Sequence, residues 1–245
     1  NMLLNSDVDF SAKADEVAQL NAPRRFDCTA ESSDTEKFWN ALYSGVETAN
    51  NFIYNLENSE MYSTENANLT QMLGEAKVLR AMFYYELLCY WGDIPFSMLP
   101  TFVTQEFILP ITSRDEIYKT LIEDLEGIAP LMKTVSEISD GVERPSKEAC
   151  WAMIARLSLQ AGGYSLRPSE GSKYGKMARP ANYQDFYKKA RTYADLVIQS
   201  GTHALNKEYK QVFIDECNFI VNNTDDAIFE LPFGNGDTGQ WGYRQ

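Results

Sequence analysis

Apolar residues recur at steps of three and four in five stretches of this chain, which is the spacing that buries one face of an α-helix. In the first stretch, Phe38, Leu42, Val46, Ala49 and Ile53 form such a stripe. The five stretches cover residues 33–58, 66–91, 113–129, 146–161 and 183–200. This pattern predicts a mainly α-helical (all-α) fold with long loops and a little β-structure.

Residues typical of helix starts and helix ends flank these stretches. The capping-box pattern occurs at residues 33–36 (SDTE) and 113–116 (SRDE), where a Ser hydroxyl and a Glu carboxylate satisfy free backbone N–H groups. Residues 92–95 (GDIP) end the second stretch, because glycine accepts the left-handed cap and proline disfavours helix in the residue before it. Gly201 ends the fifth stretch in the same way.

The last two predicted helices are expected to be antiparallel neighbours because a single loop joins them, and Ala149, Ala155, Ala190 and Ala194 allow close approach of their backbones. This arrangement resembles a tetratricopeptide helical hairpin, although no strict repeat of about 34 residues is visible. The remaining segments are predicted to be loops at residues 1–32, 96–112 and 162–181, a strand at 227–233, and a glycine-rich loop at 234–242.

The charge balance excludes several classes of partner. The 245 residues include 35 Asp and Glu against 22 Lys and Arg, a net charge of −13. Binding to nucleic acid or to an anionic membrane surface depends on clustered Lys and Arg, so neither is expected. The sequence shows no run of roughly 18 apolar residues, and hence no predicted membrane span.

The residue types offer little support for a metal site or for a catalytic nucleophile. The chain has a single histidine, His203, and four cysteines that are far apart and form no C-x-x-C pair. Residues 7–11 begin like a calcium loop, but its glycine and glutamate positions hold Ala12 and Ala18. We therefore expect no metal site and no cofactor.

Aromatic residues make up 13% of the chain and fall into two groups. Some lie on the apolar stripes and are expected to be core. Tyr164, Tyr174, Trp241 and Tyr243 lie in glycine-rich or polar loops, where no stripe would bury them. Such rings suit sugars, whose apolar C–H faces stack on aromatic rings while their hydroxyls bond to amides and carboxylates. Alternatively, each ring packs only its own loop.

Four blocks, in order, resemble the SusD/RagB family. The first is residues 75–85 (EAKVLRAMFYY) followed by 90–95 (YWGDIP), which matches an E-A-x-x-L-R-A helix that ends in an aromatic-Gly-Asp-x-Pro turn. The other three are residues 113–126, 144–162 and 227–231. The resemblance covers about residues 34–233.

This resemblance implies a nutrient-binding lipoprotein on the outer face of a Gram-negative outer membrane. Such proteins capture oligosaccharides, cover a SusC-like TonB-dependent transporter barrel and deliver the glycan to it, without catalysis. Their fold is an α-α superhelix of tetratricopeptide-like helix pairs that supports a loop-rich ligand-binding region. Membrane attachment would use an N-terminal lipid that is not present in this chain.

The resemblance also sets the expected domain organisation. Residues 1–226 correspond to the N-terminal helical region, and residues 227–245 to the start of the C-terminal region. The lipid-bearing cysteine, the first helix and the long C-terminal half have no counterpart here, so we expect the helical part of a longer molecule.

Ligand residues of the family lie in two loops, whose positions correspond to residues 5–21 and 234–245. By this resemblance, Trp241 and Tyr243 are expected to be stacking platforms. The other expected ligand-binding residues are Asp7, Asp9, Phe10, Asn235, Asp237 and Gln240. Arg80, inside the signature helix, is expected to pair with a buried carboxylate and to be structural.

Other functions remain open. A tetratricopeptide-like scaffold would bind a protein partner on the concave face of the last two helices. A SusD-like protein could also bind a peptide instead of a glycan. A glycosidase would need two facing carboxylates about 5–10 Å apart, and no acidic pair in the sequence has a distinctive setting for that role.

Overall fold

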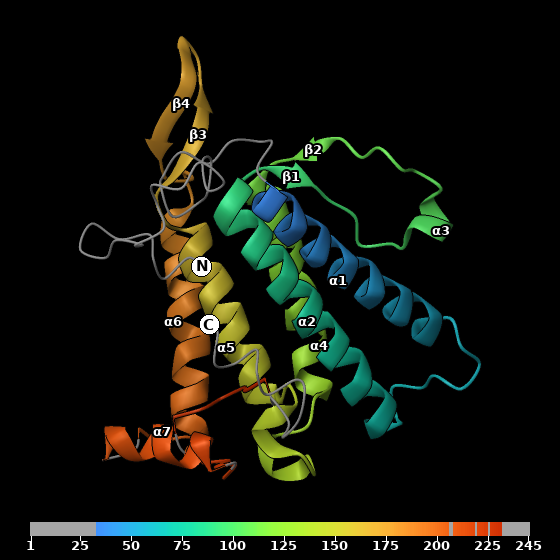
Figure 1. Ribbon diagram of the computed structural model, residues 1–245, viewed down its shortest axis with the longest axis vertical. Helices are drawn as coiled ribbons and strands as arrows, with labels where there is room; N and C mark the ends of the chain where they lie inside the picture. Colours follow the sequence, from blue (N-terminus) through green and yellow to red (C-terminus); the bar gives the residue numbers. More distant parts are fainter. Residues whose placement is uncertain (1–32, 206–207, 219, 225, 232–245) are drawn as a thin grey trace. The chain divides into compact units, whose positions relative to one another are not determined.

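The computed structural model describes residues 33–205, 208–218, 220–224 and 226–231 (Figure 1). The chain divides into two compact units, one made of Asn1–Gly45 with Pro232–Gln245 and the other of Val46–Leu231. The described part of the first unit is the first half of helix α1. The second unit contains the rest of the described chain.

The structure is mainly helical, as the sequence predicts. The long helices are α1 (Ser33–Glu57), α2 (Ala67–Trp91), α4 (Arg114–Ile128), α5 (Lys147–Ala161) and α6 (Tyr183–Ser200). Two shorter helices are α3 (Thr101–Thr104) and α7 (Tyr209–Cys217), and 3₁₀ turns occupy Ala129–Leu131, Val135–Glu137 and Gly141–Glu143. Strand β1 (Ile94–Pro95) pairs with β2 (Ile111–Thr112), and β3 (Ser165–Ser169) pairs with β4 (Ser172–Ala178), both antiparallel.

Side-chain caps explain why three of the long helices begin where they do. The Asn66 side chain accepts hydrogen bonds from the backbone N–H groups of residues 68 and 69, at the start of α2. Ser113 and Ser146 each accept a bond from the N–H three residues later, at the starts of α4 and α5. Ser33 instead lies within α1, so its predicted capping position is wrong.

The ends of two helices use glycine in different ways. Gly201 has φ +65° and ψ +8°, the predicted left-handed cap of α6. Gly92 has φ +77° but ψ −113°, which lies outside the left-handed helical region predicted for it. The positive φ still favours glycine, since L side chains rarely adopt it.

Within the second unit, α2 and α4 run antiparallel side by side, and so do α5 and α6 (Figure 1). The α5–α6 pair is the predicted tetratricopeptide-like hairpin, and the α2–α4 pair is a second antiparallel pair of the same kind. Their buried side chains form the core, in which the largest fully buried aliphatic residues are Leu87, Ile117, Leu121, Ile122, Leu125, Ile154 and Leu157. Burying such side chains contributes roughly 1.5–3 kcal/mol each.

Two of the predicted apolar faces are less buried than expected. On α6, Ala190 and Val197 are buried, but Ala194 is exposed and Ile198 is 71% exposed. On α2, Met72 lies on the apolar stripe by its spacing from Leu69, Leu73 and Ala76, and yet it is 41% exposed. The buried face of α2 includes Val78, Ala81 and Tyr84, which are almost fully buried.

The segments between the helices differ most from the predicted secondary structure. The sequence predicts a loop at residues 162–181, but most of them form the β3–β4 hairpin, with Ser165 opposite Ala178 and Arg167 opposite Lys176. The predicted loop 96–112 contains α3 and β2. The strand predicted at 227–233 is absent from its described part, residues 227–231, and helix α7 has no counterpart among the predicted elements.

Candidate functional site

The predicted ligand-binding residues all lie outside the residues that the structure describes. They are Asp7, Asp9, Phe10, Asn235, Asp237, Gln240, Trp241 and Tyr243. The structure therefore leaves their assignment a prediction. The described chain nevertheless positions several signature residues and forms two hollows on the second unit.

Arg80 is the polar centre of the helical core. Its side chain is 2% exposed, and its Nη2 donates to Asp124 Oδ2 on α4 at 2.7 Å. Its Nη1 donates to Asn50 Oδ1 on α1 at 2.8 Å and to the Met98 carbonyl at 3.1 Å. Lys77 approaches the other oxygen of the same carboxylate at 2.8 Å. Arg80 pairs with a carboxylate as predicted, but Asp124 is 17% exposed and therefore only partly buried.

The aromatic-Gly-Asp turn joins the end of α2 to the start of α4. Asp93 Oδ1 accepts hydrogen bonds from the backbone N–H of Arg114 at 3.1 Å and from its Nε at 2.8 Å. The Arg114 guanidinium lies so close to Gly92 that a Cβ there would be 2.1 Å from Nη2. Glycine is favoured at this turn by its positive φ, and a Cβ there would also displace the Arg114 guanidinium from its place beside Asp93.

The hairpin is attached to the same region through Arg167. Its Nη1 donates to the Asp115 carboxylate on the first turn of α4, and its Nε donates to the Ala178 carbonyl on β4 at 3.1 Å. The ends of α2, α4 and the hairpin are thereby held together. A hollow forms where they meet.

We call this hollow the hairpin-base pocket; its volume is about 340 Å³. Its lining combines rings, hydrogen-bonding groups and two arginines: Leu88, Cys89, Tyr90, Trp91, Gly92, Arg114, Tyr118, Gln160, Tyr164, Ser165, Leu166 and Arg167. Ser165 Oγ is buried and has no hydrogen-bond partner in the structure. This volume is at the lower end of typical ligand pockets. A lining of aromatic rings and a few unused polar groups suits a small polar ligand that has apolar faces.

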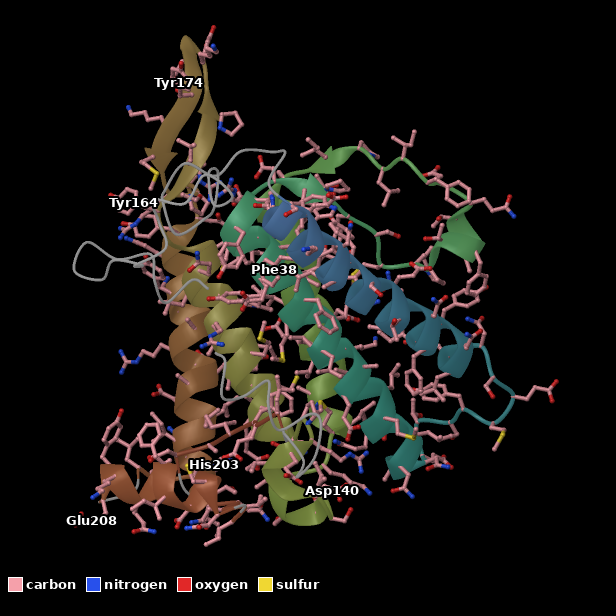
Figure 2. The ribbon with its side chains drawn as sticks, viewed as in Figure 1. Phe38, Asp140, Tyr164, Tyr174, His203 and Glu208 are labelled. Atoms are coloured by element: carbon pink, nitrogen blue, oxygen red, sulfur yellow. The ribbon has the colours of Figure 1, made fainter. Side chains whose placement is uncertain are left out.

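Two tyrosines singled out from the sequence lie on or beside this hairpin. Tyr164 is at its base, 62% exposed, and lines the pocket, whereas Tyr174 is 78% exposed and lies further toward the tip (Figure 2). Their predicted exposure is confirmed. The pocket itself could not be anticipated, because it needs the hairpin that the sequence does not indicate.

A second hollow lies beside α3 and has a volume of about 760 Å³. Its lining includes Phe102 and Phe107, which are 55% and 86% exposed. Glu47 borders it, and its Oε1 accepts a hydrogen bond from the Thr101 N–H at 3.0 Å. Sequence reasoning missed these two rings, although phenylalanines between Thr, Gln and Pro in a predicted loop were a usable signal.

The titratable groups of the hairpin-base pocket do not form an activated nucleophile. Burial raises the pKa of the Cys89 thiol and of the Tyr118 hydroxyl, so both favour their protonated forms. Across the described ranges, no group of three or more His, Cys, Asp or Glu side chains is placed to hold a metal ion. What the pocket lining offers is hydrogen-bonding groups and aromatic rings.

Antiparallel helix pairs define a tetratricopeptide-like helical protein, and the hairpin-base pocket is a polar, aromatic-lined hollow on its surface. Residues 4–159 match the SusD-like family described as "Starch-binding associating with outer membrane", and the chain belongs to this family. A similar curated relative is SusD-like protein P25 of Formosa agariphila, which is 27% identical over 86% of this chain and 39% of its own length.

Solved structures share the fold. A SusD homolog from Bacteroides thetaiotaomicron superposes with a TM-score of 0.73 at 22% identity, over 89% of this chain and 40% of that one. A crystal structure with xylogluco-oligosaccharide gives a TM-score of 0.65 at 22% identity, over 86% of this chain and 38% of that one. The chain thus spans about two fifths of the length of these relatives.

Proposed function

We propose that this protein captures oligosaccharides at the outer face of the outer membrane and delivers them to a SusC-like, TonB-dependent transporter barrel. The observation that carries the proposal is the family match over residues 4–159, because the family is described by starch binding and by association with the outer membrane. The structural neighbour with xylogluco-oligosaccharide supports a glycan as the ligand.

In this proposal the primary glycan site is formed by the predicted residues on the two loops. Trp241 and Tyr243 stack on sugar rings. Their polar partners are Asp7, Asp9, Asn235, Asp237 and Gln240, with Phe10 as a further ring. A neutral pyranose needs this combination, since its C–H faces are apolar and its rim carries hydroxyls.

Membrane association is proposed to depend on a lipid at the N-terminus of the whole protein. In the part of the chain that the structure describes, no helix has both the length and the apolar character to span a bilayer. The net charge of −13 is unfavourable for adsorption to an anionic surface. A lipid anchor would attach the protein to the membrane without a spanning helix in the described part of the chain and without a favourable surface charge.

The proposed role requires binding and no bond cleavage. The test is an affinity-gel and calorimetric screen of the whole protein against neutral and acidic glycans and peptides, with release of reducing ends measured in parallel. We expect binding of at least one glycan without reducing-end release. Binding of peptides alone would favour the peptide alternative, and sustained sugar release would show a glycosidase; either result would contradict the proposal.

A further inference from the structure

The β3–β4 hairpin has a charge opposite to that of the rest of the molecule. Residues 165–179 contain four Arg and Lys residues and one Glu, a net charge of +3 in a chain of net charge −13. Arg167 is neutralised by Asp115. Lys173, Lys176 and Arg179 make no ion pair with any residue that the structure describes.

Arg179 is held in place by aromatic rings instead of a carboxylate. Its guanidinium carbon lies 4.2 Å from the centroid of the Tyr164 ring, 5.0 Å from that of Tyr183 and 5.5 Å from that of Tyr187. The Tyr187 ring is itself positioned by Gly162, where a Cβ would lie 2.7 Å from its Cε1. Stacking of this kind orients a guanidinium and leaves its charge uncompensated.

Arg179 also has hydrogen-bonding capacity that the protein does not use. Its Nε is buried and has no hydrogen-bond partner in the structure. A ligand cannot reach that shielded atom. The two Nη groups also make no hydrogen bond with a described residue, and they are the donors available to an anionic ligand. The planar fork of arginine matches carboxylate and sulfate oxygens in pairs.

The hairpin-base pocket is next to this arginine, because Tyr164 both lines the pocket and stacks on Arg179. Lys176 lies directly opposite Arg167 in the register, so its side chain emerges on the same face of the hairpin as Arg167 and Ser165. Those two residues line the pocket as well. Two uncompensated cations therefore lie at the edge of a pocket that contains exposed rings.

We infer that the hairpin-base pocket, together with Arg179 and Lys176, is a subsite for an acidic saccharide unit that carries a carboxylate or a sulfate ester. The inference rests on the proposed capture of oligosaccharides and adds a substrate class to it. Arg179 binds the anionic group, Lys176 adds a second positive charge, and the free face of Tyr164 contacts the sugar ring. Ser165 supplies an unused hydroxyl inside the pocket.

An anionic membrane surface fits these observations less well. Basic segments that bind membranes typically gather four to eight Lys and Arg residues, whereas this hairpin has three that are not paired. A membrane would also gain nothing from a ring-lined pocket of about 340 Å³. A saccharide unit uses the charge, the rings and the pocket together.

The test is calorimetric titration of the whole protein with a short oligogalacturonate, a sulfated galactan oligosaccharide and a neutral xylogluco-oligosaccharide. The variants are Arg179→Gln and Lys176→Gln. The matched control is Arg191→Gln, which removes the same charge from an 83% exposed side chain on α6. Urea unfolding checks that each variant is folded, and Lys176→Gln with a salt titration provides the test if Arg179→Gln does not fold.

We expect at least one acidic probe to bind, with an affinity that falls with added salt and falls about tenfold or more in Arg179→Gln. Lys176→Gln should lower it several-fold, and Arg191→Gln should leave it unchanged. Affinity for the neutral probe should not differ among the variants. Binding of the neutral probe without binding of either acidic probe would overturn this subsite and leave the proposed function standing, whereas no binding of any glycan would count against both.

Three results would overturn the inference. The first is that neither acidic probe binds, and the second is that Arg191→Gln weakens binding as much as Arg179→Gln does. The third comes from a parallel titration with vesicles that contain anionic lipid, if the variants alter only the binding to those vesicles. The last result would identify the hairpin as a membrane contact.

Discussion

The Arg80 guanidinium on α2 and the Asp124 carboxylate on α4 form an ion pair in which Nη2 and Oδ2 are 2.7 Å apart and the arginine side chain is only 2% exposed. The other contacts of Arg80 reach α1 and the loop that follows β1. One arginine of the signature helix thereby fixes the relative positions of several elements within the second unit. These contacts give Arg80 a structural role in the helical core.

Replacing Arg80 by Met should strongly destabilise the protein. Asp124, only 17% exposed, would keep Lys77 as a partner, but Asn50 and the Met98 carbonyl would lose a donor. Breaking a shielded pair in this way costs about 3 kcal/mol. Urea unfolding measures the change. The control is Lys119→Met, whose pair with Glu123 is exposed and should contribute under about 0.5 kcal/mol; equal losses in the two variants would refute the structural role of Arg80.

Two glycine-to-alanine substitutions should change stability in opposite directions. Gly92→Ala forces an L residue to φ +77° and places its Cβ 2.1 Å from Arg114 Nη2, so we expect a loss of about 2 kcal/mol or more. Gly127 lies within α4, and a Cβ added there would meet nothing within 4 Å. Gly127→Ala should therefore stabilise the fold by about 0.5–1 kcal/mol. Thermal unfolding of both variants checks the sign of each effect.

Tyr84 should make stability depend on pH in the alkaline range. Burial raises its pKa from 10.0 to about 12, although hydrogen bonding with Ser97 and the charge of Arg80 act in the opposite direction. The folded state thus favours the neutral phenol. Its contribution is fully present below pH 10 and is lost as the pH rises from 10 toward 12, by up to about 3 kcal/mol.

Urea titrations across that pH range test this assignment. In Tyr84→Phe, the decline of the unfolding free energy between pH 10 and 12 should be smaller than in the wild type. The variant should also be less stable at neutral pH, because Ser97 loses bonds of 2.7 Å and 3.1 Å to the hydroxyl. Tyr209→Phe, with a 76% exposed ring, serves as the control and should keep the wild-type decline. An unchanged decline in Tyr84→Phe would show that this tyrosine is not the source.

The long helices are predictable from the sequence because their signals are local. Apolar stripes and caps such as Ser113 and Ser146 act within a few residues of each other, and all five helices lie within two residues of their predicted bounds. The role of Arg80 is also predictable, since a charge on a buried helix face needs a partner. The identity of that partner, Asp124, requires the packing of α2 against α4.

The hairpin and its pocket are not predictable in the same way. Residues 165–178 are rich in Ser, Lys and Gly and lack the alternation of apolar and polar residues that marks a half-buried strand. The pairing is stabilised partly by Arg167, which contacts Asp115 52 positions earlier in the chain. At residues 227–231 the sequence predicts a strand that the structure does not form. The apolar run there has no partner strand among the described residues.

The most direct test of the proposed function is calorimetric titration of the whole protein with the tightest-binding neutral glycan from the screen, comparing wild type with Trp241→Ala. Tyr209→Ala, which removes an exposed ring on α7, is the control. We predict that the wild type and the control bind equally and that Trp241→Ala binds about tenfold more weakly or worse, because a stacking platform is lost. Equal affinities in all three proteins, or no glycan binding by the wild type, would contradict a SusD-like glycan site at this position.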